Sequence, residues 1–273
     1  MPYPRAYLVL LALLGLVGLG FWPGYLSRLG SHSVWIHLHG ATATVWVLLL
    51  VVQSWAIHHR RVALHRLAGR FSLVLFPLFV AGGLTVLHSM AVRTLEDDLF
   101  MASYGPGLGA IDVLALATFC WLYFTALHRR REVQIHARCM LATPILLLMP
   151  VLSRVFNSYV PGLQISGPEQ FGLFVWSVYL SNLVALGVAL ALYATAPRHG
   201  RMFLVVAAVT VAQSLAFALL GPGSWWAELY VVLGRFSPMV LALIGILAGT
   251  ALAGYAWLRP RSRLGPAPDM ASG

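Results

Sequence analysis

Residues 35–61 of the chain, WIHLHGATATVWVLLLVVQSWAIHHRR, decide what kind of protein this is. After two histidines near its start, the stretch carries no Asp, Glu, Lys or Arg until Arg60 and Arg61. A bilayer core of about 30 Å needs roughly 20 apolar helical residues, because no water is present there to satisfy open backbone groups. Residues 35–57 therefore predict a transmembrane helix, and the arginines predict that it ends at the cytoplasmic surface.

The rest of the chain has the same character. Of its 273 residues, 60% are hydrophobic and only 10% are charged, whereas a soluble domain carries roughly a quarter charged residues. A lipid bilayer is therefore the expected partner of its surface. We expect an all-α polytopic transmembrane bundle of about eight helices in a single domain, residues 1–258, followed by a disordered cytoplasmic tail, residues 259–273, rich in Pro and Gly. The predicted spans are residues 5–22, 35–57, 71–92, 109–128, 139–156, 171–194, 202–220 and 238–258.

Arginine placement predicts the orientation of these spans. Every one of the 18 basic residues is arginine, which is typical of a GC-rich bacterial genome and points to the bacterial inner membrane. Fourteen of them fall on one side of the predicted spans, which makes that side, with the N- and C-termini, cytoplasmic. Because they form short clusters between apolar spans, they read as topology signals, and no nucleic acid is expected as a partner.

The ten histidines are the most informative polar residues. Ionisable side chains inside a membrane are costly, so they are functional candidates by default. On the predicted topology His37, His39 and His88 form an outer cluster, while His65 and His136 lie at the inner side. The remaining inner histidines, His58, His59, His128 and His199, are expected to be interfacial polar residues.

Two predicted spans carry polar stripes. At about 100° per residue, Thr42, Trp46 and Gln53 fall within roughly 60° of His39. His37 points about 200° away from His39, so the two are not expected to bind the same centre.

The fifth span repeats this pattern if its helix is straight. The residues within roughly 60° of His136 are then Met140, Thr143, Pro150, Arg154 and Asn157. Pro144 is expected to kink this helix. We expect Arg154 to pair with Asp112 at the outer end of the fourth span.

Gly245 and Gly249 form a G-x-x-x-G motif in the last span. Small residues let helices approach closely in lipid. The motif predicts close packing within the chain, with a dimer seam as the alternative.

Imidazoles from neighbouring helices are the usual axial ligands of a haem b bound inside a helical bundle. A haem- or metal-binding protein in redox chemistry or electron transfer is therefore the leading hypothesis. A simple metal site that includes Asp112 is the next possibility. The alternative is a carrier, or an assembly or accessory protein without a cofactor, with helices broken near Pro77 or Pro144.

Other chemistries lack their sequence signals. The chain has no H-E-x-x-H, Walker loop, G-x-G-x-x-G or G-x-S-x-G motif, and its two cysteines do not form C-x-x-C-H. Nucleotide-driven work and covalently attached haem are therefore not expected. Whether the protein is an enzyme stays open, and the residues name neither a substrate nor an electron donor or acceptor.

Three segments carry a family resemblance. The run HLHG (37–40), with Gln53 ending its stripe, LHRLAGR (64–70) and IHARCM (135–140) leading to Arg154 resemble an uncharacterised bacterial family of predicted membrane proteins with H-R-x-x-G-R and H-x-R-x-M segments. The match covers roughly residues 35–156 and implies a helical bundle in the inner membrane.

More loosely, the histidines around the third and fifth spans are similar to those of the transmembrane ascorbate-dependent b-type cytochromes. That likeness implies an inner haem shared by His65 and His136. The fourth span has Asp112 where the cytochrome pattern has a histidine. An outer haem would therefore need His39 and His88 to ligate it together.

Overall fold

The computed structural model describes residues 3–259, and these residues form helices and turns without a β-strand. Seven of the helical segments are long and apolar enough to cross a membrane, and the shorter apolar helix α1 makes an eighth crossing. This confirms the predicted all-α bundle of about eight spans. The crossings are α1 (Ala6–Phe21), α2 (Val34–His58), α3 (Val62–Leu95), α4 (Leu99–His128), α5 (Val133–Ala142) with η2 (Thr143–Leu147) and α6 (Leu148–Tyr159), α7 (Leu173–Ala194), α8 (Arg201–Leu219) and α10 (Pro238–Leu258).

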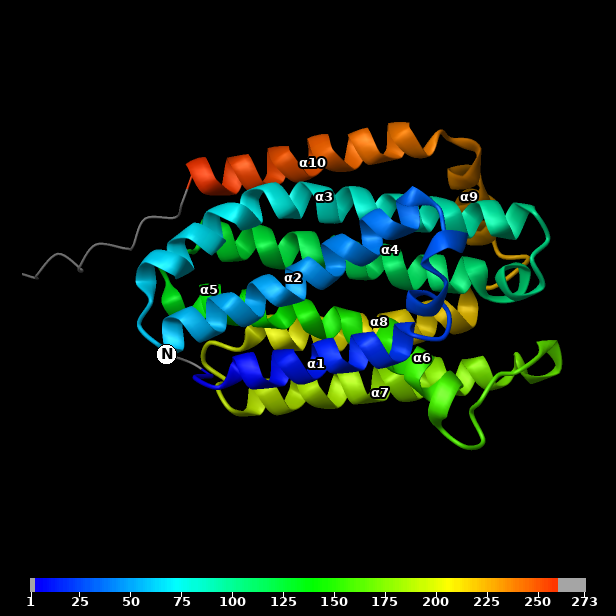
Figure 1. Ribbon diagram of the computed structural model, residues 1–273, viewed down its shortest axis with the longest axis horizontal. Coiled ribbons are helices and arrows are strands. Elements are labelled where there is room, and N and C mark those ends of the chain that lie inside the picture. The colour runs from blue at the N-terminus through cyan, green and yellow to red at the C-terminus, as the bar shows by residue number, and fades with distance from the viewer. Residues whose placement is uncertain (1–2, 260–273) are drawn as a thin grey trace, which may run out of the picture.

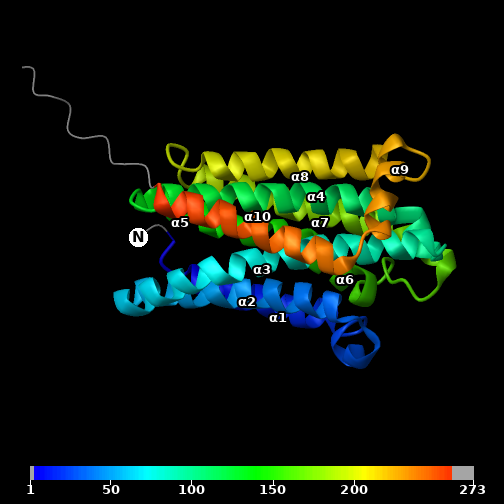
Figure 2. The same cartoon turned by 90° about the horizontal axis from the view of Figure 1, so that it is seen from above.

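The crossings run side by side along the long axis of the molecule (Figure 1). The short helix α9 (Trp225–Val232) lies at one end, between α8 and α10 (Figure 2). The start of α1 and the end of α10 both lie at the opposite end, which we call the terminal end. The other end, with α9 and the α3–α4 turn, is the distal end. An even number of crossings brings both described ends of the chain to one end of the bundle, as an eight-span topology requires.

Three crossings begin earlier than predicted. The helix α3 starts at Val62, α4 at Leu99 and α5 at Val133. The predicted spans counted only the apolar stretches, whereas the helices continue through polar and glycine-rich turns that pack on their neighbours. His65, predicted to lie in a loop, therefore occupies the first turn of α3.

The same extension changes the position of Asp112. The segment before it contains Gly105, Gly107 and Gly109, which accept close contacts and remain helical. A Cβ on Gly109 would lie 2.3 Å from a ring carbon of Tyr230. The prediction that Asp112 lies at the outer end of its span is wrong, because about 20 Å of helix precedes it.

The fifth crossing is broken, as its prolines predicted. Pro144 lies in the first turn of η2, where the ring removes a backbone donor, and the chain tightens into a 3-10 turn before α6. The face expected of a straight helix is therefore divided. Thr143 accepts a hydrogen bond from Trp46 (3.0 Å), whereas Asn157 accepts one from Ser177 on α7 (2.5 Å).

Glycines set the closest helix contacts around α3. A Cβ on Gly245 would lie 2.6 Å from the Cα of Ala81, and one on Gly249 would lie 2.6 Å from the Cα of Pro77. The G-x-x-x-G of α10 therefore packs against α3 within the chain. On the other side of α3, a Cβ on Gly82 would lie 2.9 Å from the Cα of His39 on α2.

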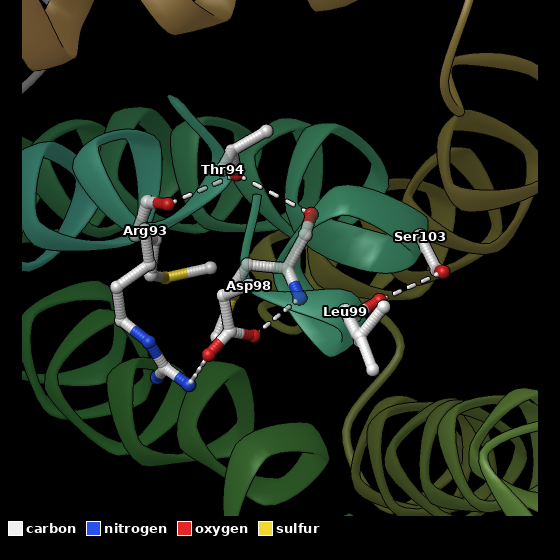
Figure 3. A network of polar contacts seen from close by, with 7 residues as sticks. Arg93, Thr94, Asp98, Leu99 and Ser103 are labelled. Carbon is white, nitrogen blue, oxygen red and sulfur yellow. Dashed lines mark hydrogen bonds and ion pairs between the residues drawn. The ribbon is translucent and has the colours of Figure 1, made fainter. Parts of the chain in front are cut away.

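The turn between α3 and α4 is held by a polar network at the distal end (Figure 3). Asp98 caps α4 by accepting a hydrogen bond from the backbone N–H of Met101 (2.9 Å), and it pairs with Arg93 (2.8 Å). Partial burial raises the pKa of the Asp98 carboxyl. The hydrogen bond from Arg93 and the backbone donors outweigh that effect, so the pKa lies below its ordinary value.

Candidate functional site

His65 and His136 come together at the terminal end, each as the fourth residue of its helix. The helices α3 and α5 both begin at this end (Figure 1) and both pack against α4. The two rings are close enough to interact electrostatically. The structure thus brings together two imidazoles that are 71 positions apart in the sequence.

Backbone carbonyls determine which nitrogen of each ring is free. The Nδ1 of His136 lies 2.9 Å from the carbonyl oxygen of Ala126. Because a carbonyl only accepts, this nitrogen carries the proton and Nε2 keeps a lone pair. The ring of His65 interacts with the backbone of Gln53, and its buried Nδ1 has no hydrogen-bond partner among residues 3–259. His136 therefore presents an unused lone pair on Nε2, and His65 presents an Nδ1 that is unpartnered within the described residues; a neutral imidazole nitrogen with a free lone pair is the form that binds a metal.

Further buried polar atoms without partners lie within about two turns of the terminal end. They are Gln53 Oε1, Ser54 Oγ, His128 Nδ1 and Arg138 Nε, counted over the described residues. An unsatisfied buried group costs about 1–3 kcal/mol, so such a concentration calls for a bound ligand or for water. A small residue makes room here: a Cβ on Gly69, in the H-R-x-x-G-R segment, would lie 3.4 Å from Nε2 of Gln53.

Positive charge surrounds this pair. Arg66 acts electrostatically on His65, and Arg130 acts on His136. Arg130 lies over the ring of Trp257 (4.4 Å) and donates to the carbonyl of Leu127 (3.2 Å). The terminal end therefore favours anionic groups on any ligand held there.

A second polar cluster lies in the distal half, between α2, α4 and α6. Arg154 interacts electrostatically with both His39 and Asp112. It forms no ion pair within 4 Å of Asp112. It donates instead to the carbonyl of Pro150 (2.8 Å) and lies over the ring of Phe21 (4.5 Å). Nδ1 of His39 is buried and without a partner in residues 3–259.

The other two candidate histidines have separate surroundings. His37 shares a hydrogen bond with the hydroxyl of Tyr25 (2.7 Å), in the connection between α1 and α2. His88 is buried and lies 3.0 Å from the carbonyl of Phe236, just before α10. His39 faces Phe79 on α3, with ring centroids 6.4 Å apart. The structure therefore does not place His39 and His88 against a common centre.

A buried aromatic cluster links the two polar regions, and sequence reasoning missed most of it. Trp46 packs on Phe119 (centroids 4.8 Å apart) and on Tyr123 (5.3 Å), and Phe79 stacks on Phe119 (4.0 Å). Trp46 was singled out only as part of a polar stripe. The residues that pack on Trp46 could have been found from their spacing in the sequence. Phe119 and Tyr123 of α4 are four positions apart and Phe76 and Phe79 of α3 are three apart, so each pair lies on one face of its helix.

No group of three or more His, Cys, Asp or Glu side chains able to hold a metal ion occurs in residues 3–259. A haem needs fewer protein ligands than a simple metal ion, because the porphyrin supplies four nitrogens and the protein supplies only the axial ligands. Comparison with family models, curated protein sequences and solved structures found no match to this chain.

Proposed function

We propose that this chain is a membrane-embedded electron-transfer protein that holds one b-type haem between His65 and His136. The observation that carries the proposal is the state of the two rings. They come from different helices and interact with each other; Nδ1 of His136 is bonded to a backbone carbonyl, and the buried Nδ1 of His65 has no partner in the described part of the chain. A haem supplies a one-electron carrier that neither imidazole provides by itself.

The surrounding residues have consistent roles in this proposal. The backbone of Gln53 and of Ala126 orients the two rings, as second-shell partners do for metal-binding histidines. Arg66 and Arg130 suit the carboxylate groups at the edge of a haem. The aromatic cluster around Trp46 keeps water out of the middle of the bundle. The free thiols Cys120 and Cys139 have no part in it.

The arginine distribution supports a cytoplasmic location of the terminal end and residence in a bacterial inner membrane. A periplasmic reporter enzyme fused after Gly273 is expected to be inactive, and the same reporter fused in the α3–α4 turn is expected to be active. The reverse pattern would overturn the orientation.

The haem is tested by absorption spectroscopy of protein purified in mild detergent. We expect a Soret band, sharp α-bands on reduction and about one iron per chain. His65→Ala and His136→Ala should each lose the spectrum and regain part of it with added imidazole. His199→Ala, which removes an exposed histidine from the α7–α8 turn, should keep it. Far-ultraviolet circular dichroism checks that the variants remain helical. A colourless, iron-free and fully helical wild-type protein would refute the proposal.

A carrier without a cofactor is the second candidate, and the distal cluster favours it. Asp112 and the exposed Arg154 interact electrostatically without forming a direct ion pair, an arrangement that suits a transient partner. Solute accumulation in proteoliposomes by a colourless preparation, abolished by Asp112→Asn, would support this function over the first.

A further inference from the structure

A groove in two adjoining parts runs along the outer face of α2 and α3 to the terminal end. Its first part, about 410 Å³, is lined only by apolar side chains, among them Val45, Leu48 and Val52 of α2 and Leu67 of α3. A second hollow of about 640 Å³ adjoins it. Leu64 lines both, so the two hollows form one groove that opens beside the α2–α3 turn.

The two ends of this groove differ in chemistry. At the terminal end Trp55, Arg60 and Arg61 join apolar residues in its walls, whereas towards the middle of the bundle every lining side chain is apolar. From Trp55 to Val45 the helix rises about 15 Å, which is the depth of one leaflet of a bilayer core of about 30 Å. The groove therefore matches the polar-to-apolar profile of one lipid leaflet.

The arginines at the mouth are unpaired. Arg60 and Arg61 are exposed, and neither forms an ion pair with any residue from 3 to 259. The one acidic residue in the described terminal-end turns, Glu132, pairs with Arg129 (3.6 Å). Only three residues separate α2 from α3, and Arg60 adopts a left-handed backbone conformation (φ 57°) within this tight turn. The turn thus holds two adjacent guanidinium groups at the groove mouth, suited to a phosphate.

We propose that this groove is a binding site for an anionic phospholipid. The phosphate would lie at Arg60 and Arg61, and an acyl chain would lie along the side chains of Val45, Leu48, Val52 and Leu67. The positive charge at the groove mouth favours an anionic lipid over the other possible occupants. A second copy of this chain in the same membrane orientation would bring its own arginine-rich terminal end to this mouth, which like charges disfavour. A zwitterionic lipid would leave the two guanidinium groups without net compensation.

The site has a structural consequence that does not depend on haem. Leu49 and Ala68 line the groove and also belong to the buried core. Val52 and Leu64, which line it too, are the chain neighbours of Gln53 and His65. A lipid in the groove therefore supports the packing of α2 on α3 where His65 lies close to Gln53.

Native mass spectrometry of delipidated full-length protein tests this, with phosphatidylglycerol or phosphatidylcholine of the same acyl chains as probes. We expect wild-type protein to bind phosphatidylglycerol about tenfold more tightly than phosphatidylcholine. The double variant Arg60→Gln/Arg61→Gln should lose this preference. The matched control, Arg198→Gln/Arg201→Gln, removes the same charge from two exposed arginines where the α7–α8 turn meets the start of α8, and it should keep the preference.

A third variant separates the groove from general electrostatics. Leu67→Trp fills the apolar part and leaves every charge in place, so it should weaken binding of both lipids. Equal binding of the two lipids by wild-type protein would overturn the proposal. So would an equal loss in the two arginine double variants, or a groove occupied by a second copy of the chain as the dominant species.

Discussion

The sharpest structural prediction concerns Gly249, where α10 touches α3. Gly249→Ala adds a single methyl group whose carbon would lie 2.6 Å from the Cα of Pro77 and 3.3 Å from its nitrogen. These neighbours are backbone atoms of a long helix, so a rotamer change cannot relieve the clash. The two helices must move apart by about 1 Å to restore an ordinary carbon–carbon contact of about 3.5–4 Å.

The expected cost follows from two opposing effects. Overpacking a well-packed interface costs about 1–3 kcal/mol, while replacing a helical glycine by alanine gains about 0.5–1 kcal/mol. We therefore expect a net destabilisation of about 1–2 kcal/mol. Gly254→Ala, in the same helix but with nothing within 4 Å of the new methyl group, should be neutral or stabilising.

Unfolding of both variants in detergent micelles, followed by circular dichroism during a denaturant titration, measures the difference. Size-exclusion chromatography of the same samples reports the oligomeric state. Equal free energies of unfolding for the two variants would refute the packing argument. A Gly249→Ala variant that changes the oligomeric state and leaves the unfolding free energy unchanged would show instead that the glycines form a dimer seam.

Three further substitutions test other parts of the fold by the same unfolding assay. Asp98→Asn keeps an N-capping side chain but removes the charge. The pKa of the folded carboxyl is depressed, so its charge stabilises the protein above the unfolded pKa of about 3.9 and that contribution is lost as the pH falls through the folded pKa. The variant should therefore unfold more easily than wild type at pH 7, and the difference should shrink at acid pH; a constant difference would contradict the ion pair with Arg93. Trp46→Ala empties a fully buried position and should cost about 3–5 kcal/mol, so a cost below 1 kcal/mol would argue against the aromatic cluster. Ser72→Ala should cost about 1–3 kcal/mol because it leaves the buried hydroxyl of Tyr123, 2.8 Å away, without a partner; Tyr123→Phe should cost less, and the opposite order would be incompatible with this bond.

Much of the architecture was predictable because lipid imposes a simple constraint. Each crossing must satisfy its backbone internally, so long apolar stretches have to become helices, and an even number of them returns both described ends to one side. Residues 238–258 were predicted as the last span, and α10 (Pro238–Leu258) has the same bounds. Helix ends made of polar or glycine-rich turns escaped this reasoning, as the starts of α3 and α4 show.

The apolar pattern did not predict which histidines lie close together, because the contacts of a side chain depend on the rotation of its helix about the helix axis. A straight fifth helix would have kept His136 and Arg154 on one face. In the structure a 3-10 turn at Thr143–Leu147 lies between them; His136 is an electrostatic neighbour of His65, and Arg154 is one of His39 and Asp112. Hydropathy therefore accounts for the number of the crossings. Their pairing was decided by close backbone contacts at glycines and by one break in a helix, which only the folded bundle contains.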